Sequence, residues 1–141
     1  MIKNNWLKYF LYAVVLIFYI TFSNIILIFL NKQTQMTYNT FSFLLGSTII
    51  FIVLGLLLGL DRLILEMKKE GKWRINLPKV IFLGLPSLYF SVGTFISFYC
   101  PIVFIQVTLC YPLSFLKGNF ISFFQIILGY IICTSFIKIK D

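Results

Sequence analysis

Side chains that could do acid, base or metal chemistry are scarce in this chain. Among its 141 residues there is no histidine, and only four residues are Asp or Glu. Three of these carboxylates, Asp61, Glu66 and Glu70, lie in one charged segment, and the long apolar runs contain none. An intramembrane acid or histidine is the usual proton relay or metal ligand of a membrane protein. We therefore predict no catalytic residue, no metal site and no cofactor, and hence a protein that is not an enzyme.

Three amide side chains in apolar surroundings are the candidates for polar chemistry, namely Asn24, Gln106 and Gln125. An amide that has no hydrogen-bond partner in hydrocarbon is costly, so these groups should find partners. One interpretation is a polar cluster around an outward-opening cavity. The simpler interpretation is structural hydrogen bonding between neighbouring helices.

The elements that must position these residues are long apolar helices. The chain is 60% hydrophobic and 11% charged, with a mean hydropathy of +0.99, whereas a soluble domain is about half apolar and a quarter charged. This composition predicts an all-α integral membrane protein with a single polytopic domain. The predicted spans cover residues 7–30, 41–60, 79–99 and 120–137, and the second helix should continue to about residue 70, before Gly71.

A charged segment from Asp61 to Lys79 sets the predicted orientation. It holds six of the twelve Lys and Arg residues, and cations at the ends of spans favour the cytoplasmic side. Both termini are then cytoplasmic. The net charge of +8 is explained in this way, so no nucleic acid partner is expected. We expect anionic lipid headgroups to contact Arg62, Lys68, Lys69, Lys72, Trp73, Arg74 and Lys79.

The segment 101–116 is apolar but shorter than the roughly 20 residues of a transmembrane helix. It is either a re-entrant or interfacial segment on the outer side, or a fifth span. Four spans place Lys138 and Lys140 on the cytoplasmic side, which gives the cleaner charge asymmetry. Cys100 and Cys110 then lie near the outer face, where pairing and free thiols are both open.

Several local patterns give further expectations. Gly55 and Gly59 are four residues apart, which suits either a helix-packing face within the chain or a contact with another protein. The polar segment from Asn31 to Thr40 is typical of an outer loop. Pro86 should bend the third span. Asp61 and Glu66 lie among cations on an amphipathic helix, which predicts a solvated face.

These features favour a small non-enzymatic membrane protein that acts as an accessory or partner-binding subunit, with a membrane protein or a second copy as partner. The alternative is a small transporter or channel that acts as an oligomer and uses the three amides. A lipid-modifying enzyme would have to rely on Asp61 or Glu66, and is the weakest of the three hypotheses. The abundance of Ile, Phe, Lys and Asn suggests an A+T-rich genome, and we predict a bacterial cytoplasmic membrane protein.

Overall fold

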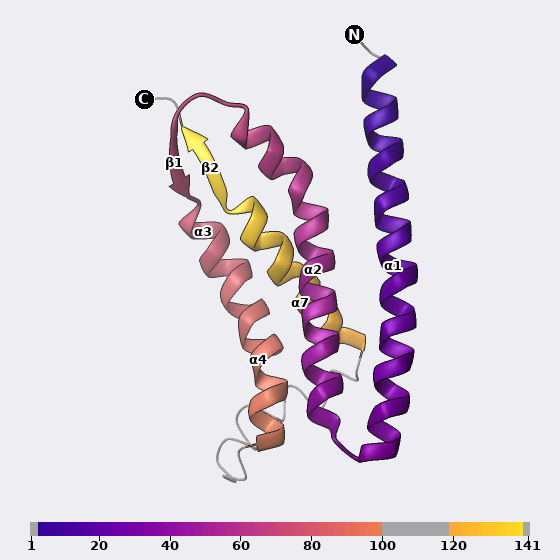
Figure 1. Ribbon diagram of the computed structural model, residues 1–141. Coiled ribbons are helices and arrows are strands. Elements are labelled where there is room, and N and C mark those ends of the chain that lie inside the picture. Colours follow the sequence, from indigo (N-terminus) through magenta and orange to yellow (C-terminus); the bar gives the residue numbers. More distant parts are fainter. Residues whose placement is uncertain (1–2, 100–118, 140–141) are drawn as a thin grey trace. The chain divides into compact units, whose positions relative to one another are not determined.

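The computed structural model describes residues 3–99 and 119–139. The chain is mostly helical and forms two compact units, Met1–Ile50 and Phe51–Asp141, which are treated in turn (Figure 1). Predictions for the segment 101–116, for Gln106 and for the pair Cys100 and Cys110 fall outside the described residues.

The first unit is a helical hairpin of α1 (Lys3–Thr37) and the start of α2 (Thr40–Met67). The turn consists of Tyr38, whose φ is 55°, and Asn39, whose side-chain oxygen accepts the Phe41 N–H at 3.2 Å. An Asn at this position satisfies one of the free N–H groups at the start of a helix. The prediction of an outer loop from Asn31 to Thr40 is therefore wrong for most of its length, because α1 continues through the polar residues to Thr37.

Single side chains make close contacts between the two helices of this hairpin. The Tyr19 hydroxyl donates to the Ile50 carbonyl at 2.8 Å, across 31 residues of sequence. Leu30 lies against Gly46, where a Cβ atom would come within 2.5 Å of the Leu30 Cδ1. A hollow of about 140 Å³ lies beside the turn and is lined by Leu30, Gln33, Thr34, Thr37, Asn39 and Ser42.

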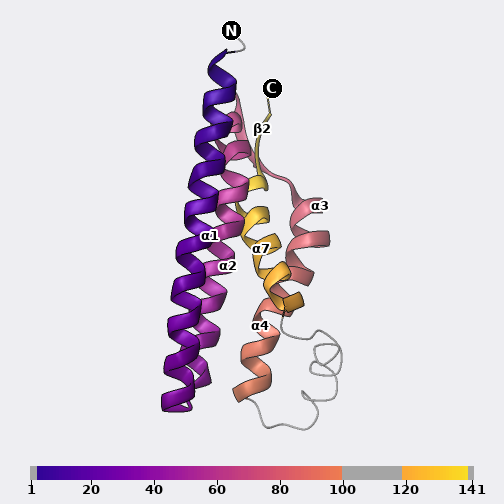
Figure 2. The same ribbon diagram turned by 90° about the vertical axis from the view of Figure 1, so that its right-hand side faces the viewer.

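The second unit contains the rest of α2 and six further elements in the described residues. They are β1 (Lys72–Ile75), α3 (Leu77–Lys79), the π-helical turn η1 (Val80–Gly84), α4 (Leu85–Tyr99), α7 (Asn119–Thr134) and β2 (Phe136–Ile139). Helices α4 and α7 pack against each other (Figure 2). Small and polar residues are buried on them, including Ser87, Ser91 and Gln125, and Phe90 stacks on Phe124 with ring centroids 4.4 Å apart.

Helices α2 and α7 approach at backbone distance through three glycines. A Cβ atom on Gly55 would lie 2.0 Å from the Ile126 carbonyl oxygen, and one on Gly129 would lie 2.1 Å from the Ile52 carbonyl oxygen. At Gly59 the added atom would meet the Cys133 Cβ at 2.6 Å. The predicted helix-packing face of Gly55 and Gly59 thus lies against another helix of the same unit.

A π-helical turn stands immediately before Pro86, where the sequence predicts a bend. The Leu85 N–H bonds to the Val80 carbonyl, one residue further back than in an α-helix. Proline has no N–H and its ring crowds the carbonyl four residues earlier, so a regular ladder cannot pass through this position. A single wider turn accommodates the missing bond and lets the helix continue.

Two short strands close one end of the second unit. They are antiparallel, with Lys72 opposite Ile139 and Ile75 opposite Phe136.

Helix α2 ends at Met67 rather than near residue 70, and Gly71 follows with a φ of 138°. Helix α7 ends at Thr134, so the helix predicted over 120–137 is too long at its C-terminal end. The fold is thus mostly helical instead of all-α.

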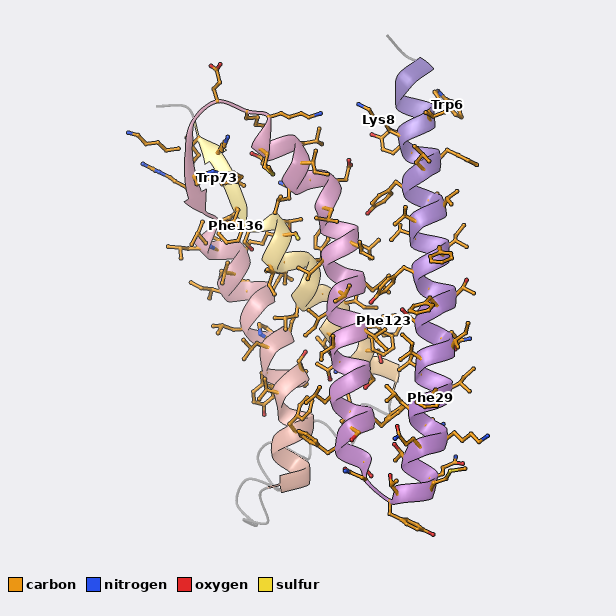
Figure 3. All side chains as sticks on the ribbon, in the orientation of Figure 1. Trp6, Lys8, Phe29, Trp73, Phe123 and Phe136 are labelled. Carbon is orange, nitrogen blue, oxygen red and sulfur yellow. The ribbon has the colours of Figure 1, made fainter. Side chains whose placement is uncertain are left out.

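Two helices in the described part of the chain are long and apolar enough to cross a membrane, Trp6–Thr37 and Thr40–Met67. Only 6% of the best apolar window of the first is buried. Side chains such as Trp6 and Phe29 project from α1 (Figure 3). Helix α2 has 28 residues, or about 42 Å, which exceeds the roughly 30 Å of hydrocarbon. Its last turns therefore extend beyond that layer if it crosses.

Candidate functional site

A connected group of polar and aromatic side chains lies at the end of the second unit that carries the strands. We call Glu66, Lys69, Trp73 and Lys138 the clasp. Glu66 comes from the last turn of α2, Trp73 from β1 and Lys138 from β2. Trp73 lies beside the two strands in Figure 3. The clasp therefore joins β2 to the end of α2 and to β1, although Lys138 and Glu66 are 72 residues apart in sequence.

Glu66 is the centre of the clasp. Its side chain accepts a hydrogen bond from the Lys69 ammonium at 2.5 Å and another from the backbone N–H of Lys138 at 3.2 Å. The residue is only 6% exposed, so the predicted solvated face is wrong for this position. The bond from Lys69, followed by the bond from the Lys138 backbone, lowers the pKa of the Glu66 carboxyl below its ordinary value.

Lys138 caps the C-terminal end of α2. Its ammonium donates to the carbonyl oxygens of Met67 at 3.0 Å and Lys69 at 2.8 Å. The last carbonyls of a helix have no partner within it, and a cation there also suits the helix dipole. The same ammonium lies 5.0 Å from the centroid of the Trp73 ring, directly across the strand pair.

Lys79 makes a matching cap at the end of α7. Its ammonium donates to the Thr134 hydroxyl and, at 3.5 Å, to the Thr134 carbonyl, and it lies 4.9 Å from the Tyr130 ring centroid. Asn76 precedes it and accepts the Lys79 N–H at 3.4 Å, while the Asn76 N–H donates to Ser135 at 2.9 Å. Each of the two helix ends is therefore capped by a lysine from a distant segment.

Three of the residues predicted to contact lipid headgroups make the contacts described above, namely Lys69, Trp73 and Lys79. The Lys69 side chain is nevertheless 57% exposed. The residues Arg62, Lys68, Lys72, Trp73 and Arg74 are exposed as well. An open hollow of about 380 Å³ is lined by Lys68, Lys69, Glu70 and Lys138. Contact of these cations with headgroups stays a prediction.

The amide cluster predicted from Asn24, Gln106 and Gln125 stays a prediction. Asn24 is exposed on α1 in the first unit, and Gln125 is buried on α7 in the second. Gln106 lies outside the described residues. Within residues 3–99 and 119–139, no three side chains from His, Cys, Asp and Glu gather as metal ligands would.

Sequence reasoning missed the clasp and the strands that form it. One signal was present in the sequence, because Lys72–Ile75 alternates charged and apolar residues. The chain matches no protein-family model, no curated protein sequence and no solved structure.

Proposed function

We propose that this chain is a multi-pass protein of the cell membrane, bacterial by its composition, that crosses the bilayer four times. The crossing elements are α1, α2, η1 with α4, and α7. The antiparallel pair β1–β2 supports this topology, because it holds residues 72–75 and 136–139 on one side of the membrane. The chain between them then crosses an even number of times. A fifth span over 101–116 would separate the two strands.

The cytoplasmic side is assigned to the strand end of the second unit. Six cations lie in the segment from Asp61 to Lys79, Lys138 lies in β2, and Lys140 follows Ile139 in the sequence. Because Lys138 contacts the end of α2 directly, these cations belong to one end of the second unit. The positive-inside tendency then favours a cytoplasmic location for that end. Residues Lys3 and Lys8, before the first span, are expected on the same side.

We further propose that the protein is a non-enzymatic accessory subunit that binds another membrane protein. The observation that carries this proposal is how the clasp and the Lys79 cap use their polar groups. Lys138 and Lys79 donate to the carbonyls that end α2 and α7, and Glu66 accepts from the backbone of β2. Catalysis or transport needs polar groups that converge on a substrate, whereas these converge on the chain's own backbone. The strand end of the second unit is therefore a basic surface that its own hydrogen bonds hold in place, which suits it to binding another protein.

A facilitator of transport is the second candidate, favoured by one observation. Gln125 is 4% exposed on α7, and a buried amide in an apolar helix can line a path for a polar solute. Flux of small solutes into sealed liposomes tests this candidate. Flux that Gln125→Leu abolishes and Ser122→Ala leaves unchanged would support it over the accessory role.

The topology is tested by labelling single cysteines with an impermeant maleimide, after the three native cysteines are replaced by serine. We expect Lys72→Cys and Ile139→Cys to react only in inside-out vesicles, and Lys32→Cys to react only in right-side-out vesicles. Labelling of positions 72 and 139 from opposite sides would reject four spans.

The accessory role is tested by native mass spectrometry of the tagged protein after gentle extraction from its own host. We expect a second membrane protein to co-purify in a fixed ratio that survives dilution. A bare monomer or homo-oligomer under several mild detergents would contradict the proposal.

A further inference from the structure

Strand β1 has one paired edge and one open edge in the described residues. The Asn76 N–H donates to the Ser135 carbonyl, so the pair Asn76 and Ser135 is a hydrogen-bonded pair of the ladder. Such pairs alternate in an antiparallel sheet, and Trp73 and Ile75 therefore belong to non-bonded pairs. Their backbone N–H and C=O groups point away from β2. Among the described residues, β2 is the only strand that pairs with β1.

The outer edge of β2, on the opposite side of the sheet, already has a hydrogen-bond partner. The Lys138 N–H, which points away from β1, donates to Glu66 at 3.2 Å. The Glu66 side chain, which comes from α2, therefore binds the outward-pointing N–H of Lys138 on β2. By contrast, all four residues of β1 are exposed. An exposed strand edge is a template for another strand, and natural proteins usually cover it or pair it.

The side chains of β1 define the strand that would fit beside it. Lys72 and Arg74 share one face, while Trp73 and Ile75 share the other with Phe136. A strand with alternating acidic and apolar residues would place its acids opposite the cations and its apolar groups beside Trp73 and Ile75. Opposite charges and aromatic contacts across strands both stabilise such a pairing.

We propose that the open edge of β1 binds an extended acidic segment of the partner protein as a third strand. This proposal rests on the accessory function above and names the chemistry of its partner. Backbone hydrogen bonds to Trp73 and Ile75 supply affinity, and the cations Lys72 and Arg74 select for acidic residues. The clasp keeps β1 in place before the partner arrives, because Lys138 and Trp73 lie against each other.

A second copy of this chain is a poor occupant of the same edge. Two copies in one membrane are related by an axis along the membrane normal. Figure 1 shows β1 with its axis roughly aligned with that of α2, which crosses the membrane in the proposed topology, so the β1 strands of two copies would pair in parallel. Lys72 and Arg74 would then lie close to the same cations of the other copy, and like charges opposite one another destabilise a sheet.

The test uses the fluorescence of Trp73 in the full-length protein in a neutral detergent. The chain has two tryptophans, so Trp6→Phe leaves Trp73 as the only reporter. The probe is a capped five-residue peptide of alternating glutamate and valine. We expect a saturable shift in Trp73 emission. A peptide with lysine in place of glutamate, and one that is N-methylated at alternate residues, should each bind at least about tenfold more weakly.

The matched variants are Ile75→Pro and Ile75→Val. Proline at this position removes only an outward-pointing N–H, and the ladder to β2 keeps its bonds. We expect Ile75→Pro to weaken peptide binding at least about tenfold, while Ile75→Val binds as the parent does. Equal thermal unfolding of the two variants shows that both are folded. Equal binding by both would overturn the proposal.

Vesicles that contain phosphatidylglycerol test the membrane surface as the occupant of this face. If these vesicles shift Trp73 emission equally in both variants and the acidic peptide does not, the strand proposal is rejected. The same experiments can reject the binding of a strand at β1 and the accessory role independently of each other. A partner that mass spectrometry finds on both variants would retain the accessory role and reject the β1 edge, whereas no partner on either would reject the role.

Discussion

The helical hairpin of the first unit and the strand end of the second unit are held in different ways. In the hairpin, threonine hydroxyls mostly donate to carbonyls of their own helix, as Thr21 does to Ile17 and Thr34 does to Leu30. At the strand end, Lys138 reaches Glu66 across 72 residues and Lys79 reaches Thr134 across 55. Apolar runs are thus sufficient to make helices, whereas charged residues decide which helix ends are joined.

Glycine packing gives the largest expected difference between the two units. Gly55→Ala would place a Cβ atom 2.0 Å from the Ile126 carbonyl oxygen, which is backbone and cannot turn aside. Helices α2 and α7 would have to separate, and we expect a loss of about 1–3 kcal/mol or more in the free energy of unfolding. Reversible unfolding in detergent, followed by circular dichroism, measures this change.

The matched control is Gly46→Ala in the hairpin. Its added atom meets the Leu30 Cδ1 at 2.5 Å, and this methyl group is at the end of a flexible side chain that can rotate. We expect a change within about 0.5 kcal/mol. If the two substitutions cost the same, backbone-to-backbone packing is not what distinguishes the units.

Glu66→Gln is expected to loosen the strand end without unfolding the helices. Glutamine still offers a carbonyl oxygen to the Lys138 N–H. However, it lacks the negative charge that pairs with Lys69, and it brings an amide NH₂ group to a buried position. Hydrogen exchange at the backbone amide of Lys138 should accelerate several-fold. Glu70→Gln, at an exposed residue, is the control and should leave that exchange unchanged. Equal protection in both variants would mean that Glu66 does not hold β2.

Acid should reproduce this effect in the unsubstituted protein. The pKa of Glu66 is lowered in the folded state from its ordinary 4.5, chiefly by the Lys69 hydrogen bond. The stabilisation is therefore complete above 4.5 and is lost as the pH falls through the lower folded value. Protection of the Lys138 amide, corrected for intrinsic exchange, should therefore decrease as the pH is lowered below 4.5. Glu66→Gln should show no such decrease, and a decrease of equal size in that variant would assign it to another group.

The contrast between the units also explains what could be predicted from the sequence. The sequence predicted that the second helix starts near residue 41, and it starts at Thr40. This start could be predicted because a polar turn precedes a long apolar run. At Pro86 the sequence predicted a bend, and the structure has a π-helical turn, Val80–Gly84, shortly before that residue. Neither β1 nor β2 was predicted, since a strand of four residues has no stability without its partner 60 residues away. Glu66 looked solvated because only the fold brings Lys138 to it.

The smallest effect is expected for the hydrogen bond from Tyr19 to Ile50 in the hairpin. Tyr19→Phe removes the hydroxyl that donates to Ile50 at 2.8 Å and leaves the ring in place. Hydrogen bonds between membrane helices contribute about 0.6 kcal/mol on average, so the free energy of unfolding should fall by no more than roughly that amount. Tyr9→Phe, at an exposed position on the same helix, is the control. A loss well above that of Glu66→Gln in the same unfolding assay would overturn the comparison, because the hairpin would then depend on specific polar contacts as much as the strand end does.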